Sequence, residues 1–129
     1  GQIRAEGAPG QGATFIIRLP EAGENYVLGH EHCGAVKGAI DRVELGNLTA
    51  VLRAIAPAAD EVQAFEGERS SKNPDFVHRV AEQNVLRTVR RVRNESAILR
   101  ELEASGAIRI VGGMYDMDTG EVAPLSEPA

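Results

Sequence analysis

The stretch "YVLGHEHCGAVKGAI", residues 26–40, joins a strand-like run to a helix-like run in one short step. The apolar run at 25–29 is bounded by turn residues, which predicts a short buried strand. Residues 33–43, "CGAVKGAIDRV", have the apolar spacing of a helix. His30 therefore stands at the end of a strand, and Cys33 stands at the start of a helix.

Imidazole and thiolate groups are the favoured protein ligands of zinc. The three-residue step from His30 to Cys33 lets both side chains point at one ion, and a helix N-terminus favours the thiolate form. On an extended backbone, His32 faces the same side as His30 and is a third candidate ligand, whereas Glu31 faces away. Glu31 is a candidate general base beside the metal. The alternative is a buried thiol with two loop histidines and no metal.

The sequence before and after this stretch adds further elements. Residues 1–12 are rich in glycine and predict a loop or loose arm. Residues 13–20, "ATFIIRLP", predict a strand that stops at Pro20. Residues 47–65 predict a helix that is divided in two at Pro57. A strand precedes the histidine and cysteine, and helices follow them.

The second half of the chain predicts a long helix, a short helix and a pair of strands. Residues 74–93 form the strongest helical pattern, with a single apolar stripe: Val77, Val80, Ala81, Val85, Val89 and Val92. Asn94 is expected to cap a further helix that Gly106 ends. Residues 107–116 and 121–125 are expected to pair as a hairpin. Strands at both ends with helices between them predict an α/β fold.

The composition of the chain limits which binding partners and which cellular location we expect. The 129 residues suit one domain, and a net charge of -5 argues against nucleic acid as a partner. No apolar run approaches the length of a membrane span, so no membrane association is expected. Cys33 is the single cysteine, which excludes an internal disulfide and favours the reducing cytoplasm as location.

Two stretches resemble the β-class carbonic anhydrases: "YVLGHEHCGAVKGAI" and "VAEQNVLRTVRRVRNESAILRELEASGAIRIVGGMYDMDTGEV". The resemblance covers about residues 26–124. It implies a truncated β-carbonic-anhydrase-like core, with helices on a short, mainly parallel sheet and a C-terminal hairpin. It also implies zinc as cofactor, with His30 and Cys33 as two ligands. The family's first motif, Cys-x-Asp-Ser-Arg, supplies another cysteine ligand and an Asp–Arg pair, and these 129 residues do not contain it.

The first part of the chain does not resemble that family. Residues 7–20, "GAPGQGATFIIRLP", resemble the end of a histidine-kinase ATP-binding domain. The resemblance is too short to imply ATP binding. We expect residues 1–24 to be a foreign N-terminal arm and strand, and residues 25–129 to be the truncated domain. The foreign strand is expected to pair with an exposed edge of the sheet.

Two arrangements of a zinc site follow from so few ligands. In one, a single chain binds zinc through His30, Cys33 and His32, with water at the fourth position. In the other, two chains related by a two-fold axis each supply His30 and Cys33. The family is built from dimers, so the expected partner is a second copy, as a homodimer or higher homo-oligomer.

The expected function is that of a zinc metalloenzyme acting on a small molecule. Zinc-bound hydroxide hydrates CO2 in carbonate dehydratase-like lyases, and without the Asp–Arg pair this activity is expected to be weak or lost. One alternative is a zinc hydrolase of activated carboxyl or phosphate esters. The other is a non-catalytic dimeric fragment with structural zinc or no metal.

Overall fold

A computed structural model describes residues 2–6, 14–18 and 23–128 and places five strands in one sheet, in the order β1-β2-β3-β4-β5. The strands are β1 (Gln2–Glu6), β2 (Thr14–Arg18), β3 (Glu24–His30), β4 (Arg109–Tyr115) and β5 (Val122–Leu125). β3 and β4 pair in parallel, and the other neighbours pair antiparallel. The predicted α/β class and C-terminal hairpin are confirmed.

The expectation of a mainly parallel sheet is wrong, because among the described strands only β3 and β4 run parallel. A parallel pair needs a long crossover. All four helices of the described residues lie in the crossover between β3 and β4. The other consecutive strands follow one another through short connections, so they run antiparallel.

The N-terminal residues contribute two strands rather than one. Residues 2–6 form a strand, so the expectation of a loop over 1–12 is wrong there, while 7–12 lie outside the described residues. The strand predicted at 13–20 is confirmed for 14–18, and its ends lie outside the described residues. β2 pairs with β3, which confirms that this strand covers an edge of the sheet beside β3.

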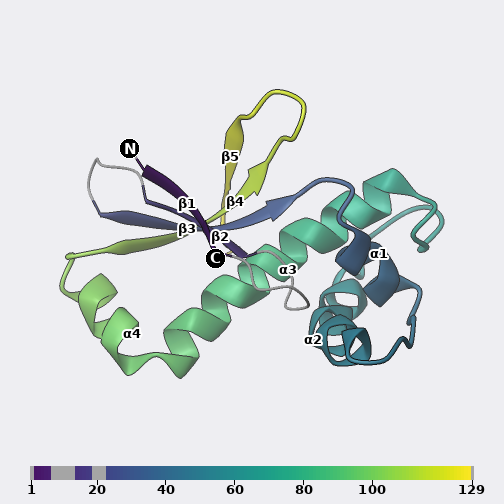
Figure 1. The fold of residues 1–129 in the computed structure, drawn as a ribbon, viewed down its shortest axis with the longest axis horizontal. Coiled ribbons are helices and arrows are strands. Elements are labelled where there is room, and N and C mark those ends of the chain that lie inside the picture. The colour runs from purple at the N-terminus through teal and green to yellow at the C-terminus, as the bar shows by residue number, and fades with distance from the viewer. Residues whose placement is uncertain (1, 7–13, 19–22, 129) are drawn as a thin grey trace.

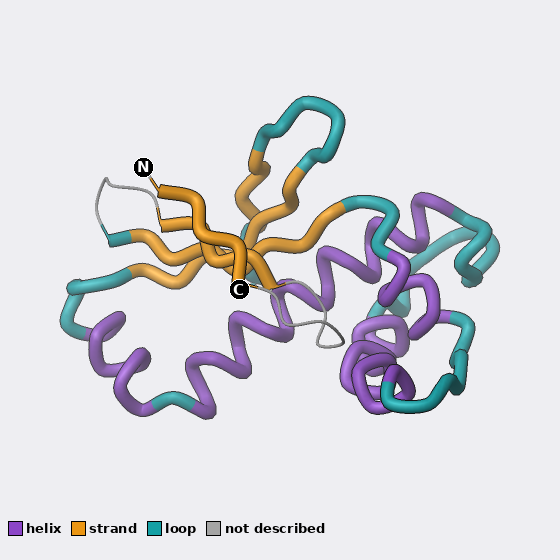
Figure 2. Tube along the Cα trace, in the orientation of Figure 1, coloured by secondary structure: helices purple, strands orange, loops and turns teal. Residues whose placement is uncertain are grey.

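The helices are α1 (Gly34–Ile40), α2 (Leu48–Glu61), α3 (Pro74–Glu95) and α4 (Ala97–Ala104). α3 runs along one side of the sheet and contacts both β3 and β4, and α1 and α2 pack together near one of its ends (Figure 1). Figure 2 shows the β4–β5 hairpin extending away from the helices. No helix in the described ranges has the length and apolar character needed to cross a bilayer.

Two predicted helix boundaries are wrong. Pro57 lies inside α2, which continues through it as one helix. The missing N–H of a proline removes one backbone hydrogen bond, and burial of Leu52, Ala56, Ala58 and Ala59 on either side of this position holds the helix together. Asn94 remains within α3, and Ser96 caps α4 instead, its hydroxyl accepting from the Leu99 N–H. Gly106 follows the end of α4 with φ of +77°.

The core surrounds α3, which packs against the sheet and against α1 and α2. The predicted stripe of α3 is buried from Val77 to Val89. Two glycines let this helix approach the strands closely. A Cβ atom added at Gly29 would lie 2.7 Å from Val85 Cγ2, and one added at Gly112 would lie 2.9 Å from Val85 Cγ1. The end of β3, which carries His30, is therefore held directly against α3.

Candidate metal site

His30 lies at the C-terminal end of β3, an interior strand of the sheet. His30 is the last residue of the strand and is in register with Tyr115 of β4. The chain then turns through Glu31 and His32, and His32 has a left-handed backbone with φ of +55°. Because the extended backbone ends at His30, the strand alternation that predicted opposite directions for Glu31 and His32 does not apply.

One ring nitrogen of His30 is already engaged. Its Nδ1 atom lies 2.8 Å from the main-chain carbonyl oxygen of Glu31. A carbonyl oxygen can only accept a hydrogen bond, so this contact places the proton of a neutral ring on Nδ1. The Nε2 atom is then left as the acceptor, which is the form that a metal-binding imidazole needs.

Cys33 lies immediately before α1, at the N-cap position, with φ of -61° and ψ of 116°. Its carbonyl oxygen accepts the first helical hydrogen bond from the Lys37 N–H at 3.0 Å. The thiol is free and half-buried, and it packs against the apolar cluster under α3. The prediction that Cys33 opens a helix is confirmed.

His30 and Cys33 open onto one pocket of about 310 Å³, which we name the Cys33 pocket. Its apolar walls come from β3, α1 and α2 and from Ala81 and Val85 of α3. α3 adds a polar side to the pocket, made of Asn84, Arg87, Thr88 and Arg91. Nothing in the sequence associated these four residues with His30 and Cys33, although their spacing of three and four marks a single helix face beside the apolar stripe.

The two outer cations of this pocket are held in ion pairs. Arg87 pairs with Glu61 of α2, and Arg90 lies 3.3 Å from the same carboxylate. Arg91 pairs with Glu95 at 3.0 Å, and this hydrogen bond raises the pKa of the Arg91 guanidinium. The positive charge around the pocket is thus largely balanced by neighbouring carboxylates.

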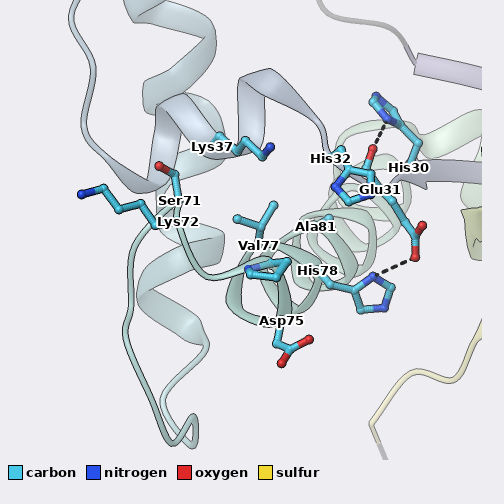
Figure 3. A pocket seen from close by; sticks show the side chains of 11 residues that line it. His30, Glu31, His32, Lys37, Ser71, Lys72, Asp75, Val77, His78 and Ala81 are labelled. Atoms are coloured by element: carbon cyan, nitrogen blue, oxygen red, sulfur yellow. Dashed lines mark hydrogen bonds and ion pairs between the residues drawn. The ribbon is translucent and has the colours of Figure 1, made fainter.

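His30 also borders a second pocket of about 550 Å³, which we name the His32 pocket. Glu31, His32 and His78 line it as well (Figure 3). The Glu31 carboxylate lies 3.7 Å from His78 Nδ1, and His78 Nε2 lies 3.3 Å from Glu82. The Glu31 side chain is thus directed at His78 (Figure 3), a residue that the predicted alternation of His30, Glu31 and His32 did not involve.

The candidate ligands are thus divided between two pockets. His30 borders both, Cys33 lines one, and His32 lines the other. Within residues 2–6, 14–18 and 23–128, no three His, Cys, Asp or Glu side chains gather in a way that could hold a metal ion. The chain brings together a pair of zinc-type ligands, His30 and Cys33.

Comparison with known proteins identifies the class that this fold and ligand pair define. The family model for carbonic anhydrase matches residues 21–122. The chain therefore belongs to the carbonic anhydrase family, and its structural neighbours place it with the β class as a partial member.

Three relatives illustrate the match. A carbonic anhydrase of Synechococcus elongatus is 25% identical over 127 residues, covering 95% of this chain and 45% of the relative. The β-carbonic anhydrase CafA of Aspergillus fumigatus is 26% identical with a TM-score of 0.65, covering 81% of this chain and 50% of that one. The Coccomyxa β-carbonic anhydrase, solved in complex with acetazolamide, is 26% identical with a TM-score of 0.65, covering 83% of this chain and 48% of that one. The chain spans about half the length of the relatives it matches.

Proposed function

We propose that this chain is a zinc-binding β-carbonic-anhydrase-like protein in which His30 and Cys33 are metal ligands. The observation that carries the proposal is that both side chains open onto one pocket while the Glu31 carbonyl engages His30 Nδ1. An imidazole with a free Nε2 and a thiol at the start of a helix are suitable zinc ligands. His32 remains a candidate third ligand.

The protein groups near the ligands have defined tasks in this proposal. Zinc with an open coordination position lowers the pKa of water to about 7 and so supplies hydroxide at neutral pH. The Glu31 carbonyl orients His30, and we assign the Glu31 carboxylate the role of general base. The apolar walls and the Thr88 and Asn84 groups of the Cys33 pocket suit a small substrate such as CO2.

We propose that CO2 hydration by this chain is weak or lost. The 129 residues lack the Cys-x-Asp-Ser-Arg motif that the family resemblance leads one to expect. Loss of the partners that orient metal-bound groups costs about 10–100-fold. The half-length match to the relatives is consistent with a chain that carries only part of a carbonic anhydrase site.

A second candidate function is hydrolysis of activated carboxyl or phosphate esters. It is favoured by the Cys33 pocket, whose volume of about 310 Å³ is larger than CO2 requires. A third candidate is a non-catalytic dimer that holds structural zinc or no metal.

The cytoplasmic location and the division of the chain after residue 24 stay predictions.

We also propose a homo-oligomer, since the similar structures include a tetrameric β-carbonic anhydrase from Sordaria macrospora, whose likeness in fold has a TM-score of 0.65. The remaining zinc ligands come either from the same chain or from a second copy.

The test is zinc content by elemental analysis after refolding with zinc, for the native chain, Cys33→Ser and His78→Ala. The native chain and His78→Ala should retain zinc, and Cys33→Ser should lose it. CO2 hydration and hydrolysis of p-nitrophenyl acetate by the same samples then distinguish the lyase from the hydrolase. Full zinc retention in Cys33→Ser would overturn the ligand assignment.

A further inference from the structure

The whole supply of imidazole and thiolate ligands in this chain can be located. The sequence holds one cysteine and three histidines, namely Cys33, His30, His32 and His78. All four lie in the part of the chain that the structure describes, and the residues outside it include no histidine or cysteine. A further ligand of this type for the Cys33 pocket must come from these residues or from another chain.

Neither of the other histidines lines the Cys33 pocket. His32 follows the turn at the end of β3 and lines the other pocket. His78 lies on α3 between Glu31 and Glu82, at 3.7 Å and 3.3 Å from their carboxylates. One chain therefore presents half of the four-ligand set that zinc takes in structural sites.

We infer that a second copy of this chain completes the zinc site, with each copy supplying His30 and Cys33. This inference rests on the proposed zinc binding. A two-fold axis through the ion presents the same two ligands twice, which gives two imidazoles and two thiolates around one metal. The two thiolates also balance the charge of Zn²⁺.

The surroundings of the ligands suit such a contact. Cys33 is half-buried rather than enclosed, and the walls of its pocket include Val51 and Ile55 of α2, which are also half-buried. Apolar side chains of this kind lose further exposure when a second molecule covers them, and this favours association. Arg91 has Glu95 as its carboxylate partner, and Arg87 shares Glu61 with Arg90, so part of the positive charge that two copies bring together is already balanced.

A shared site has a consequence for the chemistry. Four protein ligands fill the coordination sphere and leave no position for water. CO2 hydration is then lost in the paired form, and turnover comes only from chains that are not paired through the metal. The partner thus determines whether the zinc is structural.

The experiment is a zinc titration of the metal-free full chain, with bound zinc and molar mass by light scattering measured at each point. We expect saturation at one zinc for two chains, a dimer mass at saturation and a monomer mass after chelation. His78→Ala should behave like the native chain, and Cys33→Ser should remain a monomer without zinc. Circular dichroism checks that each variant is folded.

Other outcomes overturn the inference in distinguishable ways. Saturation at one zinc per chain would reject the shared site and leave the proposed zinc binding intact. One zinc for two chains combined with a monomer mass would also reject the shared site. Absence of zinc from the folded native chain would reject the proposed function itself.

Discussion

The Nδ1 atom of His30 lies 2.8 Å from the carbonyl oxygen of its own neighbour, Glu31. This contact joins the end of β3 to the turn that follows it and determines which imidazole nitrogen is free. The orienting group is part of the backbone, so it accompanies the turn and does not depend on a distant side chain. The orientation of the His30 ring is therefore determined by the residue next to it in the sequence.

The first prediction separates the two neighbouring histidines. His30→Ala should weaken zinc binding by more than the 10–100-fold that loss of an outer partner costs, because a direct ligand is removed. His32→Ala should change the affinity little under the shared-site proposal. Competition with a chromogenic chelator measures both affinities. Equal losses for the two variants would instead favour a single-chain site with three ligands.

The second prediction concerns Glu31 as a general base. Glu31→Gln should leave zinc content unchanged and lower residual turnover by about 100-fold or more, the usual range for such a group. Activity against p-nitrophenyl acetate and CO2, normalised to bound zinc, provides the measurement. Unchanged turnover would limit Glu31 to its contact with His78, which lies 3.7 Å from the carboxylate.

The third prediction tests the close contact between α3 and the sheet. Gly112→Ala should reduce the free energy of unfolding by about 1–3 kcal/mol, because the new Cβ would lie 2.9 Å from the buried Val85 side chain. Gly34→Ala is the matched control, since no heavy atom lies within 4 Å of the added carbon. Urea unfolding of both variants provides the comparison. A loss of stability in Gly34→Ala equal to that in Gly112→Ala would argue against the clash.

The fourth prediction concerns acid stability. Arg93 joins α3 to Glu103 of α4 at 2.7 Å and to Glu127 at 2.6 Å. Its hydrogen bond is the main cause that lowers the pKa of Glu103 below the ordinary 4.5. A carboxylate with a lowered pKa stabilises the fold above its unfolded pKa, and this stabilisation is lost as pH falls through the folded value.

Glu103→Gln should therefore be less stable than the native chain by about 1–2 kcal/mol near neutral pH, a range that allows for partial solvent exposure. The difference should stay constant down to about pH 5 and shrink below pH 4.5 as Glu103 protonates. Glu101→Gln, at an exposed position of the same helix, is the control. Urea unfolding across this pH range gives the measurement, and a gap that persists at pH 2 would reject the assignment.

The elements of the fold that depend on local pattern were predictable. The valine stripe of α3 has helical period, and Gly106 and the "MDTG" turn are ordinary end signals. Two predicted helix boundaries, at Pro57 and Asn94, were wrong because the surrounding structure outweighed the preference of the single residue. Burial on both sides of Pro57 kept α2 continuous, and Ser96 rather than Asn94 adopted the extended backbone of a cap. β1 was not predicted because the glycine content of residues 1–12 indicated a loop. Residues 2–6 form a strand by pairing with β2, and the local sequence does not show that pairing.

The candidate site was predictable only as far as the strand extends. Spacing placed His30 at a strand end and Cys33 at a helix start, and the structure agrees. It could not reveal that His32 takes a left-handed φ of +55°, which ends the alternation and leaves His32 on another pocket. The polar groups of α3 that border Cys33 come from far along the chain, and only the three-dimensional fold brings them there.

The parallel pairing of β3 with β4 also bears on how the chain folds. Glu24 pairs in register with Arg109, 85 positions later, so the central ladder of the sheet is a long-range contact. Long-range pairings form slowly, because a large loop must close before the contact is gained. His30 belongs to that ladder through Tyr115. Pairing of β3 with β4 is therefore expected to be a late step of refolding, at which the two ends of the crossover meet.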